Sequence, residues 1–140
     1  MVKVVGIDHI SIRVSDFAAS KAFYGKLFGF LEFQVLDEYE AAIGWTNGAT
    51  RFWIGQSEPG RRKAHTIGDV GFHHYAFELP SRADVDALQA FVRDELKATI
   101  VDPAGEYYDD YYAVFFLDPD GLKLEGMKWG EKTASKGKSS

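Results

Sequence analysis

The sequence contains no cysteine and no long hydrophobic run, and each absence excludes a class of protein. Without cysteine there are no disulfides, thiolate metal sites or cysteine nucleophiles. Without an apolar stretch of about 20 residues there is no predicted membrane span. The G-x-S-x-G, H-E-x-x-H and Walker patterns are also missing, which argues against serine hydrolases, zincins and P-loop enzymes.

Basic residues are scarce in relation to acidic ones. The 140 residues include 16 Lys and Arg against 21 Asp and Glu, for a net charge of −5. The last eleven residues, GEKTASKGKSS, hold three Lys and one Glu, so residues 1–129 carry about −7. A body this acidic repels phosphate backbones, which argues against nucleic-acid binding. Because Met1-Val2-Lys3 leads into a strand-like segment rather than a signal peptide, we expect a soluble, cytoplasmic protein.

Aromatic residues are abundant in a chain of single-domain length. They make up 15% of the sequence, with eleven Phe, seven Tyr and three Trp. A chain of this size buries enough surface to fold without covalent staples. The core or the wall of a cavity is therefore expected to be rich in rings.

The chain repeats one pattern of elements. Residues 8–14 alternate like a half-buried strand, Ser15-Asp16 caps a helical pattern that ends at Gly29, and three strand-like segments follow. A shift of 65 residues lays DHISIRV on HHYAFEL at 73–79, and a second helix falls in register. We predict an α+β fold of two tandem β-α-β-β-β modules, forming a curved mixed sheet around a cavity. The predicted segments are module 4–56, linker 57–70, module 71–129 and a disordered tail 130–140.

Two histidines and a glutamate stand out on the polar strand faces. His9 and His74 occupy equivalent positions of the two copies, opposite the residues expected to pack under each helix. Glu125 lies in the last predicted strand. Two imidazoles and one carboxylate favour a divalent Zn, Mn, Fe or Ni ion, whose identity stays open. His73, on the opposite strand face, is the alternative ligand, and His65 is expected in a solvated linker.

Three segments carry a resemblance to a known family: DHISIRVSDFAASKAFYGKLFGF at 8–30, HHYAFEL at 73–79 and FFLDPDGLKLEGM at 115–127. With them, residues 4–129 resemble the vicinal oxygen chelate superfamily of glyoxalases, bleomycin-resistance proteins and extradiol dioxygenases. The resemblance implies a glyoxalase-like fold, a homodimer, and metal ligands from the first and last strands of each half. That pattern again selects His9, His74 and Glu125. The family spans several reactions and also metal-free binders, so the fold is implied more specifically than the reaction.

The sequence departs from the four-ligand pattern at one position. The duplication sets Trp53 against Glu125, or Phe52 if the hairpins are aligned by their glycines. Neither side chain can bind a metal, so a three-ligand site is expected, which argues against the glyoxalase I reaction proper. An aromatic side chain there would offer a flat wall to a planar substrate.

Further residues are candidates for substrate binding and catalysis. Arg13 is expected to hold a substrate anion or to pair with Glu78, its equivalent in the second copy. In the tyrosine-rich segment 105–112, Tyr108 is a candidate to cap the substrate, and an acidic surface loop is the alternative for this segment. Glu125 itself, or Tyr112, is the candidate proton acceptor.

The sequence therefore predicts a divalent-metal-dependent enzyme of the glyoxalase or dioxygenase type, acting on a small substrate with vicinal oxygens. It would be a lyase, an isomerase or a dioxygenase, with the metal as a Lewis acid. The alternative is a metal-free binding protein of the bleomycin-resistance type. The net charge of −5 and the abundant aromatics would suit such a protein for a flat, cationic compound.

Overall fold

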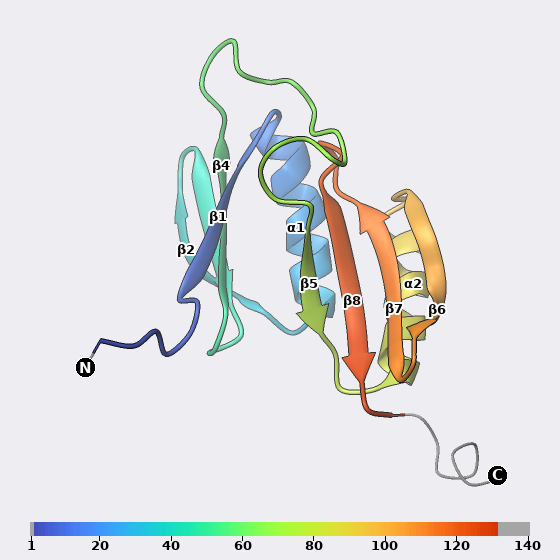
Figure 1. Cartoon of the computed structure of the whole chain (residues 1–140). Helices are drawn as coiled ribbons and strands as arrows, with labels where there is room; N and C mark the ends of the chain where they lie inside the picture. Colours follow the sequence, from blue (N-terminus) through green and yellow to red (C-terminus); the bar gives the residue numbers. More distant parts are fainter. Residues whose placement is uncertain (1, 132–140) are drawn as a thin grey trace, which may run out of the picture. The chain divides into compact units, whose positions relative to one another are not determined.

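The computed structural model describes residues 2–131, which divide into two compact units with their boundary between Ala64 and His65 (Figure 1). The boundary falls within the predicted linker 57–70. The predicted tail lies outside the described residues beyond its first two positions. Within residues 2–131, no helix is both long enough and apolar enough to cross a membrane.

The first unit has the predicted β-α-β-β-β order. Its elements are β1 (His9–Val14), α1 (Phe17–Phe30), β2 (Gln34–Tyr39), β3 (Ala42–Thr46) and β4 (Arg51–Gln56). The sheet order is β1-β4-β3-β2, with β1 parallel to β4 and the other pairs antiparallel. The parallel pair requires a crossover, and α1 lies within it.

The second unit repeats the same order. Its elements are β5 (His74–Glu78), α2 (Arg82–Asp94), β6 (Ile100–Tyr108), β7 (Tyr111–Leu117) and β8 (Lys123–Trp129). The sheet order β5-β8-β7-β6 matches that of the first unit strand for strand, including the parallel pair β5 and β8. The α+β class and the duplication are confirmed, and each unit carries its own four-stranded mixed sheet.

Both helices begin at the residues that the sequence indicates. The side chain of Asp16 accepts a hydrogen bond from the Ala19 amide, and Ser81 accepts one from the amide of Asp84. Each bond satisfies a helix N–H group that would otherwise lack a partner.

The end of α1 differs from the prediction, because the helix runs past Gly29 to Phe30. The left-handed residue that terminates it is Glu32, with a φ of 63°. There the amide of Phe33 donates to the carbonyl of Phe28 at 2.8 Å, which closes the last turn.

Aromatic rings form the core of the first unit. The rings of Tyr24, Phe28, Trp45 and Phe52 lie 5.1–6.4 Å apart between α1 and the sheet, and all four are buried. Phe52 thus belongs to the helix-facing side of β4, and Trp53 belongs to the opposite side.

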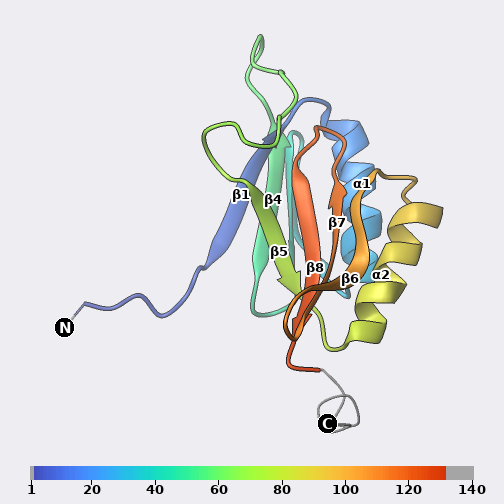
Figure 2. The same cartoon turned by 45° about the vertical axis from the view of Figure 1, so that its right-hand side comes forward.

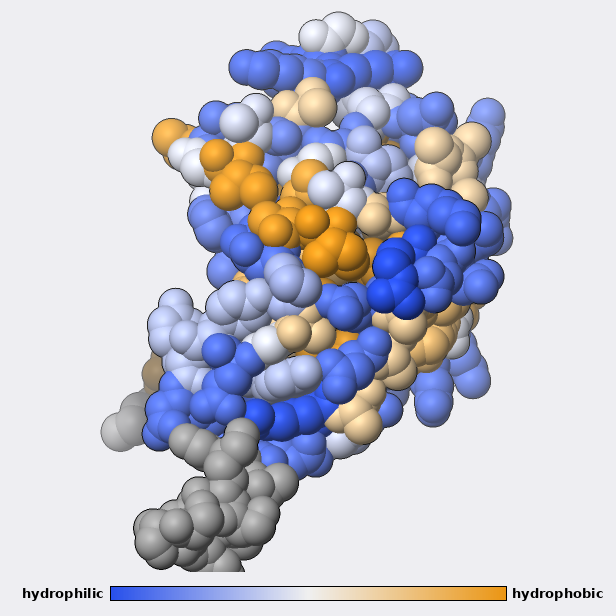
Figure 3. Space-filling view, turned by 90° about the vertical axis from the view of Figure 1, so that its right-hand side faces the viewer, coloured by the Kyte–Doolittle hydropathy of each residue, from blue (hydrophilic) through white to orange (hydrophobic). Residues whose placement is uncertain are grey.

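Aliphatic side chains and a glycine bring α2 close to the second sheet. A Cβ added to Gly126 would lie 2.4 Å from Leu88 Cδ2 and 3.2 Å from Leu79 Cδ1, so the helix approaches β8 where only glycine fits. Figure 2 shows α2 running alongside β6 and β7. Viewed from the side of β6 and α2, the surface is largely hydrophilic and is interrupted by an apolar patch (Figure 3).

The tyrosine-rich segment is more regular than an acidic loop. β6 continues to Tyr108, and Asp110, with a φ of 63°, completes a tight turn into β7 at Tyr111. The β6 ladder contains several register shifts, which indicate bulges. The alternation of faces along β6 is therefore not continuous, and the turn fixes which tyrosines of β7 face each side of the sheet.

Candidate metal centre

The second sheet brings His74 and Glu125 together on the face opposite α2. In the parallel pair β5–β8, His74 lies beside Lys123 and Ala76 lies beside Glu125, so all four side chains share one face. His74 Nε2 is 2.9 Å from Glu125 Oε1. The Glu125 side chain is only 2% exposed, whereas that of His74 is 34% exposed. A nearly buried carboxylate therefore meets an imidazole that solvent reaches.

Tyr111 completes the surroundings of this carboxylate. Its hydroxyl donates a hydrogen bond to Glu125 Oε2, the oxygen that does not contact His74. Burial raises the pKa of Tyr111, and the bond to Glu125 raises that pKa further, so the phenol stays protonated. The ring is held edge-on against Trp129, with centroids 4.5 Å apart. Tyr111 is not among the site residues predicted from the sequence.

His73 lies outside the Glu125 contact and touches His74 instead. The Nδ1 atoms of the two rings are 2.9 Å apart. The structure therefore places His74, not His73, against Glu125. Since one Nδ1 must donate to the other, the proton on His73 and the proton on His74 depend on each other.

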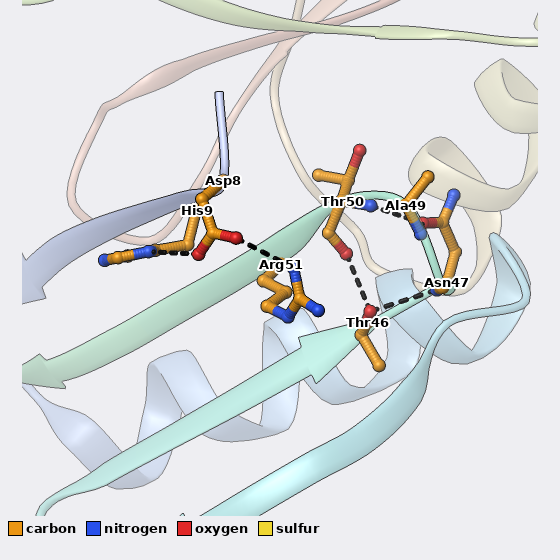
Figure 4. A network of polar contacts seen from close by, with 8 residues as sticks. Asp8, His9, Thr46, Asn47, Ala49, Thr50 and Arg51 are labelled. Carbon is orange, nitrogen blue, oxygen red and sulfur yellow. Dashed lines mark hydrogen bonds and ion pairs between the residues drawn. The ribbon is translucent and has the colours of Figure 1, made fainter. Parts of the chain in front are cut away.

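In the first unit, the ring of His9 is held by the residue before it. His9 Nδ1 is 2.8 Å from Asp8 Oδ2, and the guanidinium of Arg51 donates to Asp8 Oδ1 at 3.1 Å. Figure 4 shows the Asp8 carboxylate between the imidazole and the guanidinium. The hydrogen bond from His9 and the charge of Arg51 lower the pKa of Asp8.

The ionised Asp8 fixes the tautomer of His9. A carboxylate only accepts hydrogen bonds, so Nδ1 of His9 must carry the proton. In the neutral ring, Nε2 then keeps its lone pair, which is the state a metal ligand requires. The side chain of His9 is 55% exposed.

The strand register settles which residue of β4 is equivalent to Glu125. Trp53 lies beside Ser11, Glu125 lies beside Ala76, and Ser11 and Ala76 are equivalent in the duplication. Trp53, rather than Phe52, is therefore the residue of the first unit that is equivalent to Glu125. Trp53 and Glu125 correspond in strand, register and face.

Trp53 lies flat against the first sheet. A Cβ added to Gly44 on β3 would lie 2.5 Å from atoms Cδ2 and Cε2 of the indole, so the ring occupies the space that a side chain at Gly44 would fill. The indole stacks on Tyr39, with centroids 6.2 Å apart and an angle of 20° between the planes. Arg13 lies over Gly55 in a similar way, with Nη1 2.6 Å from an added Cβ. This face therefore offers a flat aromatic surface beside a cation.

The predicted tyrosines 108 and 112 lie apart from the Glu125 contact. Tyr112 donates from its hydroxyl to Asp86 on α2 at 2.6 Å, and Arg82 lies over its ring at 5.1 Å. The bond to Asp86 and burial raise the pKa of Tyr112 to about 12. Tyr108 is 70% exposed, with its ring 5.6 Å from that of Tyr111. Tyr111, not Tyr112, faces the candidate site.

The donor types on this face fit a divalent ion in part. An imidazole nitrogen and a carboxylate oxygen are ligands that Zn and related ions accept, and Glu125 lies deep enough to need a cationic or hydrogen-bonding partner. Lys123 has its Nζ 4.6 Å from the centre of the Phe115 ring, over that ring. Within the described residues 2–131, no three His, Asp or Glu side chains form a metal-binding group. The structure thus brings together two of the three residues predicted as ligands, His74 and Glu125.

Comparisons with known proteins agree with this architecture. The model of a family described as the Glyoxalase/Bleomycin resistance protein/Dioxygenase superfamily matches residues 6–125. The chain is 33% identical over 133 residues to YaeR of Escherichia coli (strain K12), which covers 85% of this chain and 92% of YaeR. It is 29% identical over 123 residues to the metallothiol transferase FosB of Bacillus licheniformis, covering 88% of this chain and 75% of FosB. The crystal structure of a glyoxalase/bleomycin resistance protein from Albidiferax ferrireducens T118 superposes with a TM-score of 0.73 at 25% identity, covering 89% and 98% of the two chains.

Proposed function

Because the chain belongs to the Glyoxalase/Bleomycin resistance protein/Dioxygenase superfamily, we propose that it is a divalent-metal-dependent enzyme that acts on a small substrate with vicinal oxygens. The reaction would be that of a lyase, an isomerase or a dioxygenase. The observation that carries the proposal is the 2.9 Å approach of His74 Nε2 to the nearly buried Glu125 carboxylate. The name of the relative FosB, a metallothiol transferase, supports metal dependence.

His74, Glu125 and His9 are the proposed ligands. His74 and Glu125 already face each other, and His9 presents Nε2 because Asp8 holds its Nδ1 proton. A bound Zn, Mn, Fe or Ni ion would supply Lewis-acid polarisation of two neighbouring substrate oxygens. His9 belongs to the first unit, so its place in the ligand set rests on the duplication and on the family pattern.

Glu125 is also the proposed proton acceptor. Its Oε2 accepts a hydrogen bond from Tyr111, and its Oε1 lies 2.9 Å from His74 Nε2. A carboxylate can take up a proton from a substrate when one oxygen is released. Tyr112 is a weaker candidate, since its hydroxyl is bound to Asp86 and its raised pKa of about 12 disfavours the phenolate. Tyr111 remains a hydrogen-bond donor because its pKa is raised as well.

Arg13, Trp53 and Tyr108 are proposed to contact the substrate. The indole of Trp53 and the ring of Tyr39 form a flat surface suited to a planar molecule, and Arg13 supplies a cation beside it. Tyr108 is exposed and therefore able to cap a ligand. We further propose a homodimer, which the resemblance implies, and a cytoplasmic location. Sedimentation and cell fractionation would test them.

The metal content of purified, untagged protein tests the proposal. Elemental analysis should find stoichiometric divalent metal in the wild type and little in His74→Ala, because that substitution removes one of the proposed ligand atoms. His65→Ala is the matched control: it removes an imidazole from the same unit, and the backbone amide of His65 donates to Asp120 in either case. Equal metal in wild type and His74→Ala, with His65→Ala unchanged, would show that the ligand set is wrong.

A second function, metal-free binding of a flat ligand, is favoured by one observation. The stacked Trp53 and Tyr39 rings form an aromatic surface that needs no metal to bind a planar compound, and the net charge of −5 suits a cationic one. Titration of chelator-treated protein with a planar cation such as ethidium separates the two proposals. Tight binding that is unchanged by added Zn²⁺ and lost in Trp53→Ala would favour the binding protein.

A further inference from the structure

The two oxygens of Glu125 have different partners. Oε1 lies 2.9 Å from His74 Nε2, and Oε2 accepts the hydroxyl hydrogen of Tyr111. The three residues come from β5, β8 and β7, which are neighbours in the second sheet. The carboxylate is therefore oriented from both sides, and only one of its oxygens faces the imidazole.

We propose that Tyr111 is a positioning residue that limits Glu125 to a single metal-ligating oxygen. The inference rests on the proposed function and concerns the number of donors that the protein gives to the ion. A carboxylate binds a cation through one oxygen or through both. With Oε2 held by the phenol, Oε1 is the oxygen that joins His74 as a ligand.

Tyr111 is suited to this role because its hydroxyl donates to Oε2 and its ring is held in place. The hydroxyl hydrogen points at Oε2, the oxygen of Glu125 that does not contact His74. Its ring is fixed by Trp129 on one side and Tyr108 on the other, with centroids 4.5 and 5.6 Å away. The donor therefore keeps its place beside Oε2.

We expect one-oxygen ligation by Glu125 to leave more coordination positions of the ion open for the substrate. In a six-coordinate ion, three single-donor side chains leave three positions, whereas a two-oxygen Glu125 would leave two. A substrate that binds through two vicinal oxygens needs two adjacent positions. Tyr111 would thus act on specificity and affinity for bidentate substrates without touching the substrate.

The test compares Tyr111→Phe with Tyr112→Phe. Each variant removes one hydroxyl from β7, and Tyr112 points its hydroxyl at Asp86 on α2, away from Glu125. The proteins are loaded with Mn²⁺, and the relaxation rate of bulk water protons is measured per bound Mn²⁺. The affinity for acetohydroxamate, a bidentate oxygen anion, is measured by titration of the same samples.

Tyr111→Phe should lower the relaxation rate per Mn²⁺ by about one third, as expected if three exchangeable positions become two. It should also weaken acetohydroxamate binding about tenfold, while Tyr112→Phe matches the wild type. Equal relaxation and equal acetohydroxamate affinity in Tyr111→Phe and wild type would overturn the inference and leave the proposed function intact. A wild type that binds no Mn²⁺, Zn²⁺, Fe²⁺ or Ni²⁺ would overturn both.

A measurement on the wild type alone tests the inference even if Tyr111→Phe does not fold. The separation between the antisymmetric and symmetric carboxylate stretches is larger for one-oxygen than for two-oxygen ligation. The infrared difference spectrum of metal-loaded minus metal-free wild type should show the larger separation. The smaller separation would overturn the inference.

Discussion

Replacing Gly44 with alanine tests whether Trp53 is held flat on the first sheet. The φ of Gly44 lies outside the left-handed region, so alanine fits the backbone. Its Cβ would nevertheless lie 2.5 Å from Cδ2 and Cε2 of the indole and 2.7 Å from Cε3. Carbon atoms normally approach no closer than about 3.5 Å, so the ring must move by about 1 Å or more.

The cost follows from how freely the indole moves. Overpacking a filled site costs about 1–3 kcal/mol. Trp53 is half-buried and can swing toward solvent, so we expect the lower end, about 1 kcal/mol. Displacement also removes the stacking on Tyr39, which contributes about 0.5–1 kcal/mol beyond burial. Alanine is favoured over glycine inside a strand by about 0.5–1 kcal/mol, which offsets part of this cost. Gly44→Ala should therefore reduce the free energy of unfolding by about 0.5–1.5 kcal/mol.

Gly25→Ala is the matched control. Gly25 lies inside α1, and an added Cβ there meets no atom within 4 Å. Alanine is favoured over glycine in a helix by about 0.5–1 kcal/mol, so this variant should be more stable than the wild type. Urea unfolding followed by circular dichroism measures both changes, and tryptophan emission reports the displaced indole. If Gly44→Ala has wild-type stability and unchanged emission, Trp53 does not lie where we describe it.

Three further predictions concern substitutions at Asp8, Tyr112 and Trp53. Asp8→Asn should weaken Zn²⁺ binding about 10–100-fold in a competition titration with a chromophoric chelator, because the carboxylate that fixes the His9 tautomer is lost. The hydrogen bond from Tyr112 to Asp86 stabilises the fold below the ordinary tyrosine pKa of 10 and is lost as pH rises through the folded value of about 12. Urea midpoints of wild type and Tyr112→Phe should therefore differ at pH 8 and converge toward pH 12. Trp53→Glu should tighten Zn²⁺ binding, because a second carboxylate lowers the summed charge of the ion and Glu125 from +1 to zero. The variant should also lose the preference for anionic over neutral bidentate ligands. An unchanged preference in the titration would contradict this interpretation.

The duplication made much of the fold predictable. The 65-residue shift aligns two strands whose apolar and polar positions alternate in the same phase, and alternation assigns each side chain to a face. The duplication alone sets Glu125 against Trp53 or Phe52, and the strand register decides for Trp53. Local rules were sufficient for the helix starts at Asp16 and Ser81, where a side chain caps its own helix.

The role of Tyr111 could not be predicted, because β7 gives no alternating pattern. Its sequence YYAVFFL is apolar or aromatic at every position, so periodicity does not show which tyrosine faces Glu125. The tight turn at Asp110 and the bulges of β6 decide the register. The end of α1 was predicted wrongly for a different reason. Gly29 is the residue type expected at a helix terminus, but Glu32 adopts the left-handed conformation instead.

The duplication also relates the partners of the two candidate histidines. Asp8 and His73 are equivalent positions, and each contacts Nδ1 of the histidine that follows it, at 2.8 and 2.9 Å. In both rings Nδ1 therefore contacts the preceding residue, and Nε2 takes no part in that contact. This arrangement favours ligation through Nε2.

Asp8 and His73 differ in the hydrogen bonds they can form, so they constrain His9 and His74 differently. Asp8 only accepts, so Nδ1 of His9 carries the proton and Nε2 of the neutral ring keeps its lone pair. The imidazole of His73 can donate or accept. A proton on His74 Nε2 would point toward Glu125, and His73 Nδ1 would then donate to His74 Nδ1. If His74 Nε2 were unprotonated, as ligation of an ion requires, His74 Nδ1 could donate to His73 instead. His74 and Tyr111 are the two partners of this carboxylate at 2% exposure, and under the proposed function an ion would take the place of the His74 contact.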